Sequence, residues 1–294
     1  MTTKLISQGI EGCLFYPKYK CDGSIKHDSY ASKITKIENN NELYISKLIQ
    51  QISGYKEHFI VQEKKCIPNN KIVVSILNKH KDCELSSKYK YNILYSTYLK
   101  NSQTLSSYLK KEYITINKFI SMYESIINKL NIINNHDIIH MDLHLNNILI
   151  DKNESIFIID FGSSIDLKKT NSMNYLKNNI YISDITYYLN PIEYFILYYY
   201  IHHNNINNKI IKKIIEKYYN KIHKIFPNKD DYINRAYKTL KNTKLEKLIS
   251  YAYTWDKYKL SMLSIILYEK DFYTDIFYNK LLLMIDPNPN LRSY

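Results

Sequence analysis

The stretch from Asp137 to Ser164, DIIHMDLHLNNILIDKNESIFIIDFGSS, constrains the fold of this chain more than any other part of the sequence. Asp142 and Asn147 lie five residues apart in it, and Asp160 follows the apolar run IFII directly. The apolar runs ILI and IFII flank the polar residues DKNES, a pattern that predicts a β-hairpin between Asn147 and Asp160. Polar side chains at strand ends and tight turns often carry chemistry. The stretch therefore indicates a site with two acids and an amide.

The length and composition predict a globular chain. Its 294 residues are 45% hydrophobic, which is enough for about two domains or lobes. The longest apolar runs, YFILYYYI from Tyr194 and LSMLSIILY from Leu260, are about half of the ~18 residues that a membrane-spanning helix needs. The first residues, MTTKLISQGIEG, contain no hydrophobic signal core. We therefore expect no membrane partner.

The four cysteines lie in the first third of the chain and form no CxxC pair: Cys13, Cys21, Cys66 and Cys83. This spacing is typical neither of a zinc site nor of a disulfide framework. The sequence therefore predicts four reduced thiols in a cytoplasmic protein.

The formal net charge of +13 comes from lysines that are spread along the whole chain and interleaved with Asn, Ile and Tyr. A nucleic-acid surface gathers its basic residues in a stripe or cluster, which this sequence lacks. We expect these lysines to lie on solvated faces and predict no specific nucleic-acid partner. None of these features fixes the oligomeric state.

The order of the predicted elements divides the chain into a strand-rich part and a helical part. Up to about residue 100, strands are predicted around GCLFYP, YASKITKI, KIVVSIL and YNILYSTYL, with one helix at NNNELYISKLIQQIS. From Thr104 onward, helical spacing of apolar residues recurs in TLSSYLKK, NKFISMYESIINKLNIINNHD and NNKIIKKIIEKYYNKIHKIF. The pattern predicts a small mixed lobe followed by a larger helical lobe.

Two motifs on either side of the predicted hairpin resemble those of the protein kinases. HMDLHLNN resembles the catalytic loop H-R-D-L-x-x-x-x-N, and IIDFGSS resembles the metal-binding D-F-G segment. The resemblance implies an α+β, bilobal protein-kinase-like fold over residues 1–294. A small β-rich N-lobe with the ATP loop would occupy residues 1–100, and a helical C-lobe would occupy residues 101–294.

The resemblance also implies roles for the three polar residues. Asp142 would be the catalytic residue that accepts the proton of the substrate hydroxyl or orients that hydroxyl. Asn147 and Asp160 would bind Mg²⁺, with Mn²⁺ as an alternative ion, because oxygen ligands suit a hard cation held against ATP phosphates. Taken singly, each residue could instead cap or start a turn; their common frame favours the catalytic interpretation.

An expected nucleotide-binding loop precedes these motifs. SQGIEGCLF resembles G-x-G-x-x-G-x-V, with Ser7 in place of the first glycine, Gly9 and Gly12 in place of the other two, and Leu14 in place of Val. Backbone that approaches phosphates favours residues without a Cβ atom. Since the chain has only 5 glycines, two of them at these positions favour this loop over an ordinary turn.

A lysine and a glutamate follow in the order that the family has. YASKI resembles V-A-I-K and indicates that Lys33 binds the α- and β-phosphates, with Lys36 as the alternative. The next predicted helix offers Glu42 as the ion-pair partner, although Glu38 is nearer along the chain. Exposed charges are the other interpretation of Lys33 and Glu42; their order and spacing favour the pair.

Three downstream segments are typical of protein kinases rather than of their small-molecule relatives. TYYLNPIE resembles the segment ending in A-P-E, with Ile192 inserted before Glu193. TWDKYKLSMLSIILYE resembles the buried helix that begins D-x-W-S-x-G, in which Asp256 would bond to the catalytic-loop backbone. IDPNPNLRS resembles D-P-x-x-R, which implies a pair between Arg292 and Glu193.

Several departures from the family pattern are informative. Met141 stands where many kinases have Arg, and His144 replaces the usual Lys, as in aminoglycoside and choline kinases. About 60 residues separate Glu193 from Asp256, which predicts inserted helices near residues 200–250. The P-x-E ending, the inserted helices and the abundance of residues with AT-rich codons together resemble the divergent Ser/Thr protein kinases of large DNA viruses. That resemblance implies a location in the host cytoplasm or in the virion.

The resemblance implies a serine/threonine protein kinase that acts on protein substrates. Thr186, where Ser/Thr kinases resemble one another, and the residues LHLNN after Asp142 favour this acceptor class. One alternative is a small-molecule phosphotransferase, which the DLH sequence favours. The other is an ATP-binding pseudokinase, which the loss of the first loop glycine favours.

Overall fold

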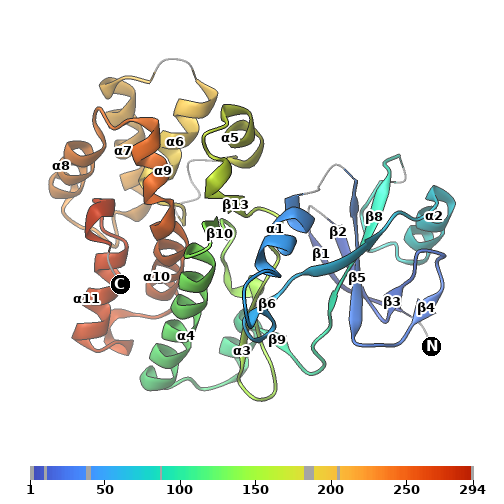
Figure 1. Ribbon diagram of the computed structural model, residues 1–294. Coiled ribbons are helices and arrows are strands. Elements are labelled where there is room, and N and C mark those ends of the chain that lie inside the picture. The colour runs from blue at the N-terminus through green and yellow to red at the C-terminus, as the bar shows by residue number, and fades with distance from the viewer. Residues whose placement is uncertain are drawn as a thin grey trace. The chain divides into compact units, whose positions relative to one another are not determined.

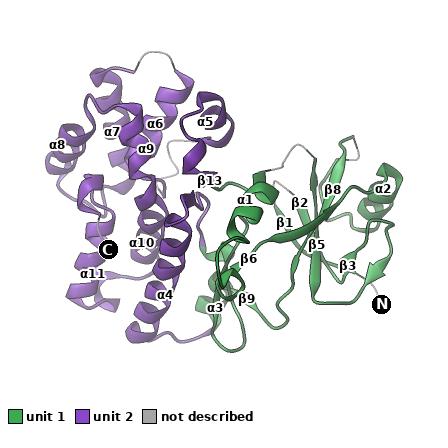
Figure 2. Cartoon of the chain, in the orientation of Figure 1, with its two compact units in different colours: residues 1–111, 145–164 green, residues 112–144, 165–294 purple. Residues whose placement is uncertain are grey.

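The computed structural model describes residues 3–9, 12–37, 41–86, 88–181, 189–203 and 206–292 (Figure 1). The chain forms two compact units (Figure 2): residues 1–111 with 145–164 make unit 1, and residues 112–144 with 165–294 make unit 2. Unit 1 is rich in strands and unit 2 in helices. This confirms the predicted α+β fold with a β-rich N-terminal lobe and a larger helical C-terminal lobe.

A five-stranded antiparallel sheet forms the centre of unit 1. In spatial order its strands are β1 (Lys4–Gly9), β2 (Gly12–Tyr16), β5 (Tyr30–Lys36), β8 (Tyr91–Thr97) and β7 (Gln62–Cys66). The middle strand β5 is buried along nearly its whole length, because strands flank it on both sides and apolar side chains cover it. Helix α1 (Asn41–Ile49) contacts β7. A charged side chain on β5 is therefore held in a fixed place.

A second, four-stranded sheet of unit 1 contains the hairpin that the sequence predicts. Its order is β6 (Phe59–Ile60), β12 (Ile156–Ile159), β11 (Ile148–Ile150) and β9 (Gln103–Thr104), and α3 (Leu105–Lys111) packs beside it. Ile148 pairs with Ile158 across the hairpin. Asn147 directly precedes β11 and Asp160 directly follows β12, so both lie at the same end of the hairpin. The small hairpin of β3 (Lys18–Tyr19) and β4 (Ile25–Lys26) completes the strands of this unit in the described residues.

The segment KIVVSIL forms a helix, so the prediction of a strand there is wrong. It lies in α2 (Asn70–Lys79), where the Asn69 side chain accepts a hydrogen bond from the Lys71 N–H at 2.9 Å and so caps the first turn. Val73, Ile76 and Leu77 are the buried residues, at the spacing of one helix face. The β-branched run suggested a strand, but burial of that single face and the N-cap stabilise the helix.

The four cysteines form two disulfides in unit 1, Cys13 with Cys83 and Cys21 with Cys66, so the prediction of four reduced thiols is wrong. The partners are 70 and 45 residues apart along the chain, yet each pair of Cα atoms is 6.0 Å apart. Cysteine spacing does not reveal such proximity, because the sheet brings distant segments together. Because disulfides are rare in reducing compartments, the cysteines do not support the predicted cytoplasmic location.

Unit 2 contains a large apolar core and is built mainly from helices. These are α4 (Ile116–Asn134), α5 (Met173–Asn179), α6 (Ile192–His202), α7 (Asn208–Ile222), α8 (Lys229–Leu240), α9 (Leu245–Ser250), α10 (Trp255–Leu267) and α11 (Asp275–Met284). A two-stranded sheet joins β10 (Ile138–Ile139) to β13 (Ile165–Asp166). Helices α7 and α8 pack against each other in the region where the sequence predicts an insertion. In the part of the chain that the structure describes, no helix is both long and apolar enough to cross a membrane.

Short 3₁₀ turns connect several of these elements. They span Tyr55–Glu57, Leu145–Asn147, Leu167–Lys169, Tyr251–Thr254, Lys270–Phe272 and Pro289–Leu291. The second of them leads directly into β11 and ends at Asn147. This turn therefore fixes the position of Asn147 at the start of β11.

Candidate active site

Lys33 lies at the centre of a charged cluster in unit 1. Its Nζ atom is 2.8 Å from Oε2 of Glu42 and 3.2 Å from Oδ1 of Asp160. Lys33 and Glu42 are both buried, so neither is the exposed charge that the alternative interpretation required. The alternative lysine, Lys36, instead has its Nζ atom 4.0 Å from the centre of the Tyr89 ring. The alternative acid, Glu38, lies outside the described residues.

The second carboxylate oxygen of Glu42 is also bound. Nε2 of Gln62 donates a hydrogen bond to Oε1 of Glu42 at 2.8 Å, and the Gln62 backbone N–H donates to Oγ of Ser46 at 3.1 Å. Gln62 therefore links strand β7 to helix α1 and fixes the direction of the Glu42 carboxylate. The sequence did not indicate this residue, since no motif distinguishes it from any other Gln at the start of a strand.

Asp160 follows β12 in a left-handed backbone conformation, with φ at 61°. The next residue, Phe161, is buried and packs edge-on against Phe59, with ring centres 5.9 Å apart. Nδ2 of Asn41, the first residue of α1, donates to the carbonyl oxygens of Gly162 at 2.9 Å and Ser164 at 2.8 Å. Packing and hydrogen bonds thus hold the segment that presents Asp160. Asn41 is a second residue that the sequence did not indicate.

Asn147 and Asp160 carry the oxygen atoms that suit a hard divalent cation. Asn147 is buried at the end of its 3₁₀ turn, whereas the Asp160 side chain is 43% exposed. A carboxylate and an amide oxygen at the same end of one hairpin fit Mg²⁺ or Mn²⁺ by their chemistry. Among the described residues no three His, Cys, Asp or Glu side chains form a metal cluster.

The two loop glycines differ in what surrounds them. A Cβ atom added to Gly12 would lie 2.3 Å from the carbonyl oxygen of Ile34, so close packing against β5 accounts for this glycine. A Cβ atom at Gly9 would have no described atom within 4 Å. Ile10 and Glu11, between the two, lie outside the described residues. Leu14 pairs with Lys33 across β2 and β5, which places it beside the charged cluster.

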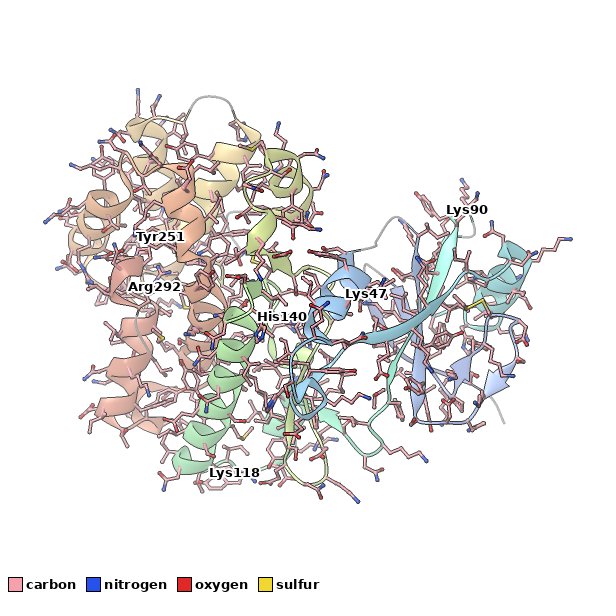
Figure 3. The ribbon with its side chains drawn as sticks, viewed as in Figure 1. Lys47, Lys90, Lys118, His140, Tyr251 and Arg292 are labelled. Atoms are coloured by element: carbon pink, nitrogen blue, oxygen red, sulfur yellow. A yellow bond between two sulfur atoms is a disulfide. The ribbon has the colours of Figure 1, made fainter. Side chains whose placement is uncertain are left out.

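Asp142 belongs to unit 2, where helix α10 holds its loop. The Asp256 carboxylate accepts hydrogen bonds from the backbone N–H groups of His140 at 2.7 Å and Met141 at 3.0 Å. This confirms the predicted contact between Asp256 and the catalytic-loop backbone. Figure 3 labels His140. Met141 has a φ of 68°, and the following Asp142 side chain is 45% exposed. Nε2 of His144 lies 3.7 Å from Oδ2 of Asp142.

A buried ion pair joins the end of the described chain to α6, as the sequence predicts. Nη2 of Arg292 is 3.2 Å from Oε2 of Glu193, and Nη1 also donates to Oε1. Both side chains are 0% exposed. Nε of Arg292 donates to the carbonyl oxygen of Asp286 at 2.7 Å, so the guanidinium group is bound on two sides. Thr186, the threonine that favoured Ser/Thr acceptors, lies outside the described residues.

A buried lysine bound by a glutamate and by the acid of an IIDFG segment, together with the two lobes, defines the class of kinase phosphotransferases. The sequence pattern of the protein kinase domain family matches residues 17–187, which is more than half of the chain. The chain therefore belongs to the protein kinase domain family. No curated protein matches it.

The matched range contains the polar residues for which the sequence predicts roles: Lys33, Glu42, Asn147 and Asp160 in unit 1, and Asp142 in unit 2. Gly9, Gly12 and Leu14 precede it, and the residues that hold the large lobe together, Glu193, Asp256 and Arg292, follow it. The contacts of those three residues in unit 2 are thus an observation separate from the family match.

Proposed function

We propose that the protein is a serine/threonine protein kinase that transfers the γ-phosphoryl group of ATP to hydroxyl groups of proteins. The position of the Lys33 ammonium group between Glu42 and Asp160 carries this proposal. Phosphoryl transfer needs positioning and charge neutralisation more than covalent help from the protein. A buried lysine with two acid partners supplies a positive charge whose place is fixed before the nucleotide binds.

The residues of unit 1 bind the nucleotide in this proposal. Lys33 binds the α- and β-phosphate oxygens, and Gly9 leaves room for backbone to approach the phosphates. Asn147 and Asp160 hold Mg²⁺ through their oxygen atoms. When bound, the ion neutralises the charge that grows on the phosphate oxygens during transfer. Glu42 and Gln62 keep the Lys33 side chain in position.

Asp142 acts on the acceptor. As the hydroxyl oxygen forms its bond to the γ-phosphorus, the Asp142 carboxylate accepts the hydroxyl proton. The bond between the γ-phosphorus and the oxygen that bridges it to the β-phosphate breaks, and ADP leaves with that electron pair. Because Met141 replaces the arginine that would bind a phosphorylated residue, activity does not require prior phosphorylation of the chain.

Contacts in unit 2 favour a protein acceptor over a small molecule. The bonds of Asp256 to the catalytic loop and the buried pair of Arg292 with Glu193 are those that the protein-kinase motifs imply. The position of His144 close to Asp142 favours the alternative, a phosphotransferase acting on an amine or a sugar. The pseudokinase alternative is weakened by the presence of a complete set of base, lysine and metal-binding side chains.

Labelled ATP with a panel of acceptors tests the proposal. We expect label on serine or threonine of generic protein substrates, and on the protein itself, when the products are separated by phospho-amino-acid analysis. Label on tyrosine alone, or on an aminoglycoside or choline alone, would refute the Ser/Thr assignment and leave a phosphotransferase. Binding of ATP without transfer to any acceptor would identify a pseudokinase.

Several finer statements rest on the sequence resemblance alone and stay predictions. The first is that the whole chain forms one kinase domain whose lobes divide near residue 100. The others are the similarity to kinases of large DNA viruses and the location in the host cytoplasm or the virion. Determining the redox state of the four cysteines in the purified protein bears on the last of these, because a reducing compartment keeps thiols free.

A further inference from the structure

Lys259 is a buried lysine for which the reaction described above has no use. It lies on α10, three residues after Asp256, and its side chain is only 2% exposed. Lysines are among the residues least often buried, because removing an ammonium group from water is costly. Burial lowers the pKa of Lys259, while the carboxylates of Asp256 and Asp142 act in the opposite direction.

The ammonium group of Lys259 is bound to the catalytic loop. Its Nζ atom donates a hydrogen bond to the carbonyl oxygen of Met141, and the N–H of the same Met141 donates to Asp256. Helix α10 therefore binds both backbone polar groups of the residue that precedes Asp142. Met141 is also strained, because a non-glycine residue at a φ of 68° is in a costly conformation that neighbouring contacts must offset.

The sequence departs from the family motifs at both partners of this contact. In TWDKYK, Lys259 stands at the serine of the D-x-W-S-x-G motif, and in HMD, Met141 stands at the arginine of H-R-D. Compared with the family motifs, the loop therefore lacks a cationic residue and helix α10 has an additional one. A positive charge is thus retained close to Asp142, but it comes from α10.

We propose that Lys259 is a positioning residue for Asp142, whose ammonium group fixes the left-handed backbone at Met141 and so holds the carboxylate in place for the acceptor. This inference rests on the proposed role of Asp142. Asp256 accepts a hydrogen bond from the N–H of Met141, whereas Lys259 donates one to the carbonyl oxygen of Met141. Without Lys259 the Met141 peptide can rotate, and Asp142, which follows it directly, moves with it.

The competing explanation is that Lys259 only neutralises the buried Asp256 carboxylate. The two explanations differ in what they predict for catalysis. A counter-ion stabilises the fold of unit 2 and has no specific effect on transfer, whereas a positioning residue affects kcat and leaves nucleotide binding, which depends on unit 1, unchanged.

The test uses the full chain with Lys259→Met, which keeps most of the side-chain volume and removes the charge, and Lys257→Met on the same helix as a matched control. For Lys259→Met we expect kcat to fall on the order of 10²-fold, as for other small displacements of a reacting group. The affinity for Mg·ATP by calorimetry should be unchanged. Lys257→Met should keep the wild-type kcat, and Lys259→Arg, which retains a cationic donor, should recover part of the loss.

Amide hydrogen exchange of the segment 138–144 supplies a readout that does not depend on activity. In Lys259→Met we expect exchange to become faster in this segment than in the rest of unit 2. This expectation holds even if the wild-type protein transfers phosphate to no acceptor. Such a lack of transfer would refute the proposed function but not the role of Lys259. An unchanged kcat in an active protein, or exchange that rises evenly over unit 2, would overturn the role of Lys259. If Lys259→Met does not fold, Lys259→Gln, with a neutral and shorter donor, takes its place with the same criteria.

Discussion

Two residues in left-handed backbone conformation position two acids to which the proposed function assigns roles, one acid in each unit. Asp160 itself has a φ of 61°, and Met141, with a φ of 68°, directly precedes Asp142. Such conformations are costly for residues with a Cβ atom and persist where surrounding contacts enforce them. Here the contacts are those of Asn41 with the segment after Asp160 and of Asp256 with Met141. The position of each acid thus depends on a residue distant in sequence.

Replacing Asp142 tests its role as the catalytic base. Asp142→Asn keeps the size of the side chain but cannot accept the hydroxyl proton, so transfer should fall by about 10²- to 10⁴-fold. Steady-state kinetics with a protein acceptor measures this loss. The melting temperature and the affinity for Mg·ATP should stay at their wild-type values, and wild-type turnover in the variant would refute the role.

The two proposed metal ligands should contribute unequally. Asp160→Ala removes the charged ligand and one partner of Lys33, so Mg²⁺-dependent ATP binding should be lost. Asn147→Ala removes a neutral ligand and should weaken binding less. Calorimetry with and without Mg²⁺ measures both, and equal Mg·ATP affinities of the Asp160→Ala variant and the wild type would contradict the assignment.

The two loop glycines should respond differently to the same substitution. Gly12→Ala forces a Cβ atom against the Ile34 carbonyl oxygen and should destabilise the protein by about 1–3 kcal/mol. Gly9→Ala meets no described atom, so the melting temperature should hold while ATP binding weakens by about tenfold, or about 1.4 kcal/mol. Thermal melts and ATP titrations measure the two effects, and each variant serves as the control for the other. An unchanged ATP affinity in Gly9→Ala would remove Gly9 from the nucleotide site.

At the scale of elements, local patterns were predictable and long-range contacts were not. The hairpin β11–β12 and helices α1, α4 and α7 follow from apolar periodicity and turn residues, which are local properties. The pair of Lys33 with Glu42 was predicted only because the family motif supplied it. Gln62 and Asn41 belong to no motif, and Lys259 departs from the motif residue at its position. The partners of these three side chains are 20, 121 and 118 residues away. Such contacts depend on how the elements pack.

The two disulfides should stabilise unit 1 through the loops that they close. Loops of 70 and 45 residues correspond to about 4 kcal/mol each if the effect is entropy lost by the unfolded chain. Reduction should therefore lower the melting temperature by on the order of 10 °C, as thermal melts with and without a thiol reductant would measure. Mass spectrometry of unreduced peptides should recover the pairs Cys13–Cys83 and Cys21–Cys66. Alkylation of all four cysteines without prior reduction would contradict the pairing.

At the scale of the whole molecule, a single side chain connects the end of the described sequence to a helix about a hundred residues earlier. Arg292 reaches Glu193 on α6, and both side chains are excluded from solvent. Breaking a buried pair leaves one charge uncompensated. The last described residues thus belong to the large lobe and contribute to its stability.

Removing Arg292 alone should therefore cost more than removing both charges. Arg292→Met should destabilise the protein by about 3–5 kcal/mol, because the Glu193 carboxylate is left buried without its partner. The double variant Glu193→Gln with Arg292→Met should recover part of that loss. Chemical denaturation of the two single variants, the double variant and the wild type gives the coupling energy. Additive losses would mean that the pair contributes little beyond its separate side chains.

The bonds from Asn41 to Gly162 and Ser164 have a consequence for inhibitor design. A compound that occupies the place of Phe161 must displace this ring from Phe59, and the backbone on either side of Gly162 would have to release the Asn41 side chain. Such compounds should bind slowly and weakly to the wild-type protein. Asn41→Ala should speed their binding and leave unaffected the ATP competitors that do not displace Phe161, which would give a medicinal chemist a way to sort hits by binding mode.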